Sequence, residues 1–178
     1  MSISGTVQSV NIASKKGRSK QPVASIQIRE NWGVEGDAHA GMLEDADHKG
    51  WAHRQVSLLA WESICKAREA GLDVKEGDFA ENITTEGIDL LALPLGSKVG
   101  IGPDVELELS QIGKVCHTKC AIYRLMGDCI FPREGIFFVV RRGGQVKPGD
   151  TIAIKKWGNG TCAATPQEAL EELAANPR

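Results

Sequence analysis

The sequence lacks the features that direct a protein to a membrane or to a nucleic acid. Its longest apolar runs are far shorter than the roughly 20 residues that a membrane-spanning helix needs, and residues 1–20 contain no apolar stretch of signal-peptide length. Basic and acidic residues nearly balance, 21 against 23, which leaves a net charge of −2 and no electrostatic case for binding DNA, RNA or an anionic membrane. We therefore expect a cytoplasmic protein with neither nucleic acid nor membrane among its partners.

Two common catalytic signatures are also missing. The sequence contains neither a G-x-S-x-G nucleophile elbow nor an H-E-x-x-H zinc motif, so it does not support hydrolysis. Internal repeats and low-complexity tracts are absent as well, which argues against a solenoid or a second domain. With 178 residues, 42% of them hydrophobic and 25% charged, the composition is typical of one globular domain. We place that domain at residues 1–157, and a linker with a C-terminal helix at residues 158–178.

Hydrophobic patterning predicts mostly strands. The segment 105–110 alternates between apolar and polar residues, as expected of a strand with one face in the core. The apolar run 136–140 fits a strand that is buried on both faces. Three further segments are rich in β-branched residues or follow a turn. The predicted strands are therefore residues 4–12, 23–28, 105–110, 136–140 and 151–154.

Only two segments carry clear helical signals. The first is predicted to begin at Ser57 as its N-cap and to run towards Gly71. The second combines Thr165 as N-cap with Pro166 at the first helical position and Glu168 three residues after the cap. Because many short strands with glycine-rich turns accompany so few helices, the predicted fold is mainly β, a β-barrel with a few peripheral helices.

The sharpest cluster of reactive side chains lies between positions 116 and 129. It consists of Cys116, His117, Cys120 and Cys129. Five cysteines are an odd number, and in a reducing compartment they are thiols for metal, sulfur or redox chemistry rather than a disulfide framework. Lys114, His117 and Lys119 flank Cys116, and such cations favour the reactive thiolate. The cluster therefore favours functional chemistry over the alternative of small buried apolar side chains.

The residues alone leave the type of chemistry open. The same four residues could hold a tetrahedral zinc ion in a non-catalytic metal-binding module, although adjacent ligands such as Cys116 and His117 are awkward and no paired C-x2-C is present. A thiol-redox enzyme would more typically carry C-x-x-C beside a βαβ unit, whereas the spacing here is C-x3-C. Sulfur chemistry at Cys116 is the third alternative.

A second group of candidate residues comes earlier in the chain. The glycine-rich segment 33–41 contains Asp37 and His39, and Arg54 follows it. These side chains offer polar groups to an anionic heterocycle, and the glycines let the backbone come close to it. Asn82 lies between apolar neighbours and is equally suited to satisfying buried backbone groups. Arg133 is either a surface charge or an anion-binding residue.

Five motifs follow one another in a specific order and spacing. They are Gly33-x-x-Gly36-Asp37-x-His39-x-Gly41, Arg54-Gln55-Val56-Ser57, Phe79-x-Glu81-Asn82-Ile83, Gln111-x-x-x-x-Cys116 and Lys147-Pro148-Gly149-Asp150. The ordered set resembles the MOSC domain, a module named after the C-terminal domain of the molybdenum cofactor sulfurase. The resemblance extends to about Trp157 and is greatest to the small stand-alone members, whose motifs are similar to Gly113 to Cys120 and Gly127 to Phe137 here.

This resemblance implies a MOSC-type β-barrel that handles the molybdenum cofactor (molybdopterin), or sulfur destined for a metal centre. Cys116 matches the characteristic cysteine of the family, proposed to carry sulfur as a persulfide or to ligate molybdenum. The candidate cofactor-binding residues are Asp37, His39, Arg54, Asn82, His117, Cys120, Cys129 and Arg133. Longer members carry an arginine three residues before the cysteine, where this chain has Gly113, and Arg133 is the candidate replacement.

The resemblance also implies partners. The chain has no pyridoxal-phosphate desulfurase domain, so we expect no pyridoxal phosphate and instead a separate sulfur donor, such as a cysteine desulfurase. The expected acceptor is a molybdoenzyme or a protein of cofactor biosynthesis. Turnover is left open: the chain is a sulfurtransferase-like protein, a cofactor carrier without turnover, or an oxidoreductase that needs a reductase partner.

Overall fold

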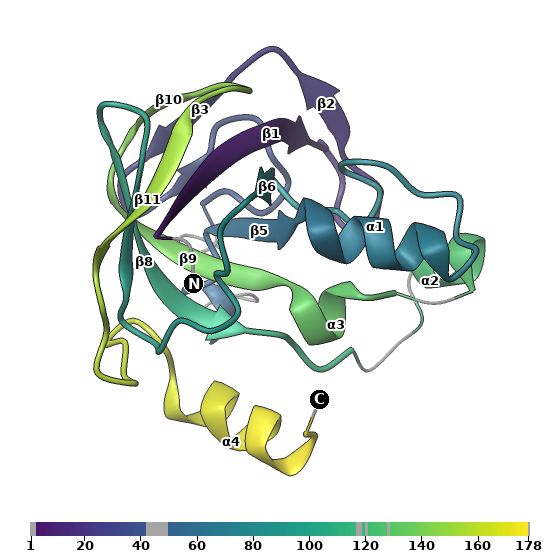
Figure 1. Cartoon of the computed structure of the whole chain (residues 1–178). Coiled ribbons are helices and arrows are strands. Elements are labelled where there is room, and N and C mark those ends of the chain that lie inside the picture. Colours follow the sequence, from purple (N-terminus) through teal and green to yellow (C-terminus); the bar gives the residue numbers. More distant parts are fainter. Residues whose placement is uncertain (1–2, 42–49, 117–118, 120, 128, 178) are drawn as a thin grey trace.

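Seven strands close into a β-barrel in the computed structural model of the chain, which describes residues 3–41, 50–116, 119, 121–127 and 129–177. In their order around the ring they are β1 (Ser4–Ile12), β11 (Thr151–Lys156), β7 (Lys98–Ile101), β8 (Val105–Ile112), β9 (Ile136–Arg142), β5 (Val56–Ala60) and β6 (Ile83–Glu86). The pairing of β1 with β11 closes the ring, and β5 and β6 run parallel where the other neighbours are antiparallel (Figure 1). The predicted mainly β barrel is confirmed.

The interior of the barrel is filled by the apolar faces of its strands. In β8 the side chains of Val105, Leu107 and Leu109 are buried, as the alternating pattern predicts. The apolar run at the start of β9 is buried residue after residue, which agrees with a strand covered on both faces. Burying each such Leu or Phe side chain contributes roughly 1.5–3 kcal/mol.

A second apolar core lies outside the barrel, next to the candidate site. In β5, Leu58 belongs to the barrel core and the adjacent Leu59 to this second core, because successive strand residues face opposite sides. Leu59 shares this core with Ile64 from α1 (Trp61–Glu69) and with Phe131 from α3 (Phe131–Glu134). The helix α2 (Ala121–Met126) adds Ile122.

A small three-stranded sheet accompanies the barrel. It consists of β3 (Ile26–Arg29), β4 (Gly33–Val34) and β10 (Gly144–Val146). The segment 23–28, predicted as one strand, is in fact divided: β2 (Gln21–Val23) pairs with β1, whereas β3 pairs with β10. The two pairings use different sheets, so the chain has to leave the first one after Val23.

The helix predicted with Ser57 as its N-cap begins three residues later. Ser57 lies in β5, and α1 follows with Ala60 as its N-cap, without a side-chain cap. The Ser57 side chain is occupied by a hydrogen bond that it donates to Asn82 Oδ1 at 3.1 Å. The β-branched and leucine residues of this segment pair with both β6 and β9, and this pairing outweighs the capping signal.

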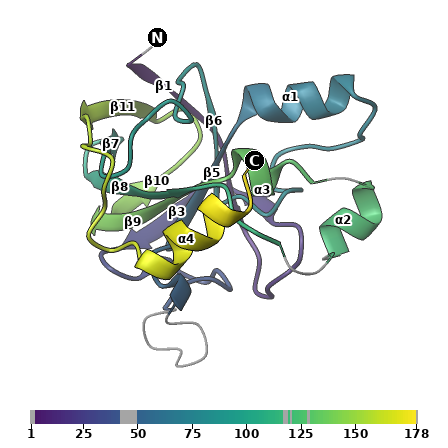
Figure 2. The same cartoon turned by 90° about the horizontal axis from the view of Figure 1, so that it is seen from below.

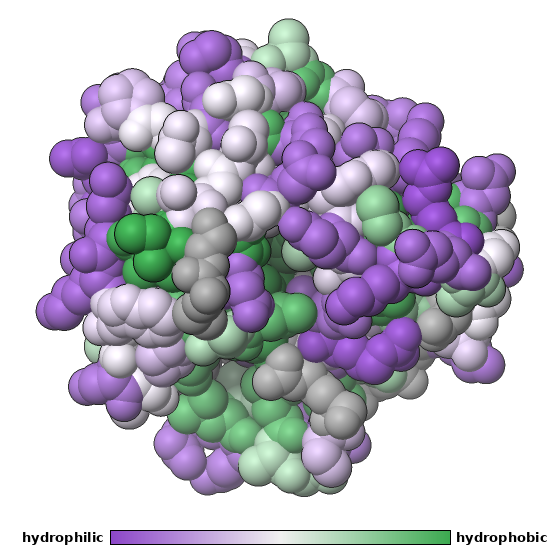
Figure 3. All heavy atoms as spheres, in the orientation of Figure 1, coloured by the Kyte–Doolittle hydropathy of each residue, from purple (hydrophilic) through white to green (hydrophobic). Residues whose placement is uncertain are grey.

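The predicted C-terminal helix is present as α4 (Gln167–Ala175), with Pro166 rather than Thr165 as its N-cap. The Thr165 hydroxyl instead donates a hydrogen bond to the carbonyl of Ser110 in β8, at 2.6 Å, and so ties the linker to the barrel. Figures 1 and 2 show α4 lying along one side of the barrel, and Figure 3 shows apolar surface gathered over it. Among the described residues, no helix has the length and apolar character needed to cross a membrane.

Candidate functional site

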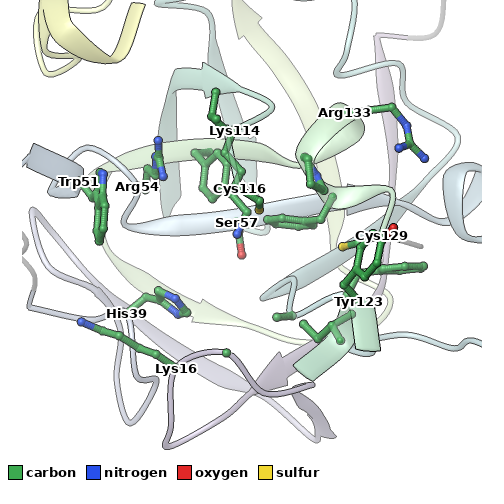
Figure 4. A pocket seen from close by; sticks show the side chains of 18 of the residues that line it. Lys16, His39, Trp51, Arg54, Ser57, Lys114, Cys116, Tyr123, Cys129 and Arg133 are labelled. Carbon is green, nitrogen blue, oxygen red and sulfur yellow. The ribbon is translucent and has the colours of Figure 1, made fainter. Parts of the chain in front are cut away.

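A cavity of about 840 Å³ opens beside the barrel, where segments far apart in the sequence meet (Figure 4). Its walls come from the β1–β2 loop, the loops before β5 and β6, the segment after β8, the helices α2 and α3, and the start of β9. The second apolar core supplies its floor, since Phe79, Phe131 and Phe137 belong to both. This volume is in the range of small-molecule sites.

The charge of the lining has one sign. The basic residues that line the cavity are Lys16, Arg54, Lys114, Lys119 and Arg133, and His39 joins them. Among the described residues of the lining there is no aspartate or glutamate. Aromatic rings occupy much of the remaining wall, including Trp51, Tyr123 and Phe137. Such a cavity suits a ligand with a flat apolar body and negative charge.

Cys116 reaches the cavity because the chain turns sharply after β8. Gly113 has a φ of 72°, in the left-handed region that favours glycine. The segment is then fixed against α3 and β9, since Gly113 N donates to the carbonyl of Gly135 at 2.7 Å and Lys114 N to that of Pro132 at 3.0 Å. Cys116 is exposed and lines the cavity. The side chain with the strongest sequence signal is therefore accessible to a ligand.

The structure describes only some of the other site residues predicted near Cys116. Cys129 is buried and also lines the cavity, and Arg133 on α3 lines it from an exposed position. His117 and Cys120 lie outside the described residues. Within the described part of the chain, no group of three or more His, Cys, Asp or Glu residues could hold a metal ion.

Arg54 is held in the lining by two aromatic rings. Its guanidinium lies 5.4 Å from the ring centroid of Phe137 and 5.9 Å from that of Trp51, distances at which cation–π attraction operates. Burial lowers the pKa of Arg54, while the charges of Glu172 on α4 and of Cys116 act to raise it. Arg54 is thus within electrostatic reach of the Cys116 sulfur.

Gln111, which was part of a motif but not among the predicted site residues, connects Arg54 to the Cys116 segment. Its buried Oε1 accepts a hydrogen bond from Arg54 Nε at 3.2 Å and lies 2.6 Å from His53 Nε2. Its Nε2 donates to the carbonyl of Gly113 at 2.7 Å. Because an amide oxygen only accepts, His53 donates from Nε2. One side chain therefore orients both the guanidinium and the turn before the thiol.

Asn82 contributes mainly to the cavity wall. Its Oδ1 accepts hydrogen bonds from the backbone N–H and the hydroxyl of Ser57, both at 3.1 Å. Its Nδ2 donates to the carbonyl of Asn11 at 3.3 Å. Asn82 thereby connects β1 and β5 and satisfies a buried backbone group, one of the two roles left open for it, and its role as a cofactor-binding residue stays a prediction.

Asp37 lies behind the cavity lining, in a buried ion pair with Lys20. The Lys20 Nζ donates to Asp37 Oδ1 at 2.6 Å and to Oδ2 at 2.7 Å, and both side chains are only 1% exposed. Burial would raise the pKa of Asp37, but the contacts with His39 and Lys20 hold it well below its usual range. Burial lowers the pKa of Lys20, and Asp37 opposes that effect.

His39 stands between this ion pair and the cavity. Its Nδ1 lies 3.4 Å from Asp37 Oδ2, its side chain is 38% exposed, and it lines the cavity. Burial lowers the pKa of His39, Asp37 raises it, and the charges of Lys20 and Lys114 lower it further. The net effect lowers the pKa of His39 and so favours its neutral form.

Glu81 is fully buried close to the same ion pair. Burial raises its pKa to about 7. Its Oε1 accepts hydrogen bonds from Gly77 N at 2.6 Å and from the Thr84 hydroxyl at 2.9 Å. Within the described part of the chain, its Oε2 has no hydrogen-bond partner. The carboxyl group is therefore poised to change charge near neutral pH.

Comparisons with known proteins agree with this fold. A family model of the MOSC domain matches residues 45–153. The YuaD protein from Bacillus subtilis has a similar structure, with a TM-score of 0.71 and 19% identity over 87% of this chain and 97% of that one. YiiM from Geobacillus stearothermophilus has a TM-score of 0.61 and 17% identity over 97% and 92% of the two chains. YiiM from Escherichia coli has a TM-score of 0.63 and 16% identity over 99% of this chain and 80% of that one. No curated protein matches the sequence.

Proposed function

Because the chain belongs to the MOSC domain family, we propose that it binds the molybdenum cofactor in this cavity and uses Cys116 to carry sulfur as a persulfide. One observation carries the proposal. The exposed thiol of Cys116 shares a cavity of about 840 Å³ with five basic side chains and several aromatic rings. A pterin that bears a phosphate has the matching chemistry, a flat ring system with negative charge.

The residues of the lining fit the cofactor by their donor chemistry. Arg54, Lys114 and Lys119 would bind its anionic groups, since Arg and Lys are the usual partners of phosphate. Trp51 and Phe137 offer ring faces to the pterin. When bound, the cofactor would supply a redox-active molybdenum, for which the Cys116 sulfur is the candidate protein ligand. The chain itself binds and orients the cofactor.

Sulfur loading of Cys116 needs a thiolate and a donor. The thiolate attacks the outer sulfur of a donor persulfide, the donor S–S bond breaks, and its electron pair leaves with the donor thiolate. Neither an added oxidant nor an added reductant is required. Arg54 lies within electrostatic reach of Cys116. A cysteine desulfurase is the donor of the required chemistry, and a molybdoenzyme or a protein of cofactor biosynthesis is the acceptor.

Native mass spectrometry tests the proposal directly. The protein is purified without oxygen from molybdenum-replete cells and compared with the Cys116→Ala variant, and each spectrum is examined for pterin, zinc and single added sulfur atoms. We expect pterin or added sulfur in the wild type and its loss in Cys116→Ala. The matched control is Cys65→Ala on α1, a residue that does not line the cavity, which should behave as the wild type. One stoichiometric zinc ion without pterin or sulfur would overturn the proposal in favour of a structural metal site.

A further inference from the structure

His39 is held in a way that prepares its imidazole to take up a proton. Asp37 Oδ2 lies 3.4 Å from Nδ1, so the neutral tautomer that suits this carboxylate has its hydrogen on Nδ1 and its lone pair on Nε2. Asp37 is fixed in turn by Lys20 through two contacts, at 2.6 and 2.7 Å. It also accepts hydrogen bonds from the backbone N–H groups of Ala13 and His39, both at 3.1 Å. The Asp37 carboxylate favours the imidazolium that forms on protonation, whereas burial and the charges of Lys20 and Lys114 oppose it.

His39 and Cys116 face the same space from different parts of the fold. His39 follows β4, whereas Cys116 follows β8, and Figure 4 shows the two side chains entering the cavity from different walls. The charge of Lys114, two residues before Cys116, acts on His39. A ligand in the cavity can therefore touch the sulfur with one atom and the imidazole with another.

The charges around His39 favour an anionic product. The groups whose fields reach the imidazole are Asp37, Lys20 and Lys114, and Lys16 lines the same cavity. Three of these four are cations. A nucleophile that loses its proton to His39 gains negative charge, which these cations stabilise.

From this geometry we infer that His39 is the proton acceptor when sulfur leaves Cys116 for a thiol acceptor, an inference that rests on the proposed function. The acceptor S–H gives its proton to His39 Nε2 as its sulfur attacks the outer sulfur of the Cys116 persulfide. A new S–S bond forms on the acceptor, the Cys116 S–S bond breaks, and the electron pair stays on Cys116 Sγ. His39 then releases the proton to solvent. The products are the Cys116 thiolate, the acceptor persulfide and a proton, so atoms and electrons balance.

The test measures sulfur transfer from loaded protein to glutathione. Cys116 is loaded with polysulfide and its added sulfur is counted by mass spectrometry before each run. The loss of that sulfur and the formation of glutathione persulfide are then followed in the wild type and in His39→Gln. Near pH 7 we expect His39→Gln to be slower by roughly a hundredfold, a common size of general-base effects. At about pH 9.5 the two rates should converge, because most glutathione is then ionised without help.

Two further readouts separate a proton acceptor from a merely structural residue. A structural role for His39 would lower the rate by a constant factor at every pH, and that result would overturn the inference. In His39→Ala, added imidazole should restore part of the lost rate near pH 7, and the absence of rescue would count against a base at this position. Full loading with equal rates in wild type and His39→Gln would overturn the inference alone. Failure of the wild type to hold sulfur on Cys116 would overturn the proposed function and the inference together.

Discussion

Glu81 offers a test of the buried charges around Lys20 and Asp37 that does not depend on any ligand. Its carboxyl group is fully buried, and burial raises its pKa from 4.5 to about 7. In the unfolded chain the same group titrates near 4.5. Below that value both states are protonated, and the contribution of Glu81 to stability is fully present. As the pH rises, the unfolded state ionises first, so stability is lost until the pH passes about 7.

The size of the effect follows from the difference between the two pKa values. A difference of about 2.5 pKa units at about 1.4 kcal/mol per unit gives a total loss of about 3.5 kcal/mol of unfolding free energy. The charge of Lys20 lowers the pKa of Glu81 and thereby opposes the effect of burial. Glu81→Gln removes the titrating group while keeping an oxygen that can accept from Gly77 N and the Thr84 hydroxyl.

We expect the wild type to lose stability relative to Glu81→Gln between about pH 4 and about pH 8, by up to about 3.5 kcal/mol. Urea denaturation across this range, followed by circular dichroism, measures the difference between the two proteins. Glu69→Gln is the matched control, because Glu69 is an exposed carboxylate at the end of α1; it should keep the pH dependence of the wild type. Parallel curves for wild type and Glu81→Gln would refute the reasoning, because they would mean that Glu81 ionises in the folded state as easily as in the unfolded one.

Three other substitutions test the remaining contacts. Asp37→Asn leaves the ammonium group of Lys20 buried without its carboxylate, so urea denaturation should show a loss of about 3–5 kcal/mol; unchanged stability would contradict the buried ion pair. Arg54→Met removes the central cation of the cavity and should weaken binding of the fluorescent anion pterin-6-carboxylate by about tenfold or more, whereas Arg68→Met on α1 should bind it like the wild type. Equal affinity in both variants would exclude Arg54 as an anion-binding residue. Gln111→Leu removes the hydrogen-bond acceptor for Arg54 and should lower the free energy of unfolding by about 2 kcal/mol. It should also weaken the binding of pterin-6-carboxylate.

The barrel could be predicted because its strands carry local signals. The alternation in β8 and the apolar run of β9 reflect which faces are buried, and burial follows the pleat of each strand. Two of the errors arose where a local signal competed with long-range pairing. Ser57 has the residue type of a helix N-cap, but β5 pairs with two strands distant in sequence. Likewise, nothing local separates β2 from β3, which belong to different sheets.

The candidate site could be predicted only in part, for the same reason. Cys116, His39 and Arg54 stand in motifs, and all three line the cavity. The ion pair of Lys20 with Asp37 joins residues 17 positions apart across a fold that the sequence does not show. Lys20 has the residue type of a surface cation, yet it is one of the largest fully buried side chains. No local pattern separates such a lysine from an exposed one.

The cavity depends on the region that the family model matches and also on segments that precede it. The matched residues 45–153 supply Cys116 and Arg54, but the residues before position 45 supply His39 and the ion pair behind it. Burying that ion pair has a desolvation cost that an apolar pair of similar volume would avoid. A fold that needed only a stable wall would have no use for these charges. Their position directly behind an imidazole that faces the cavity is therefore best explained by the chemistry of the site, with the proton acceptor on one wall and the sulfur on another.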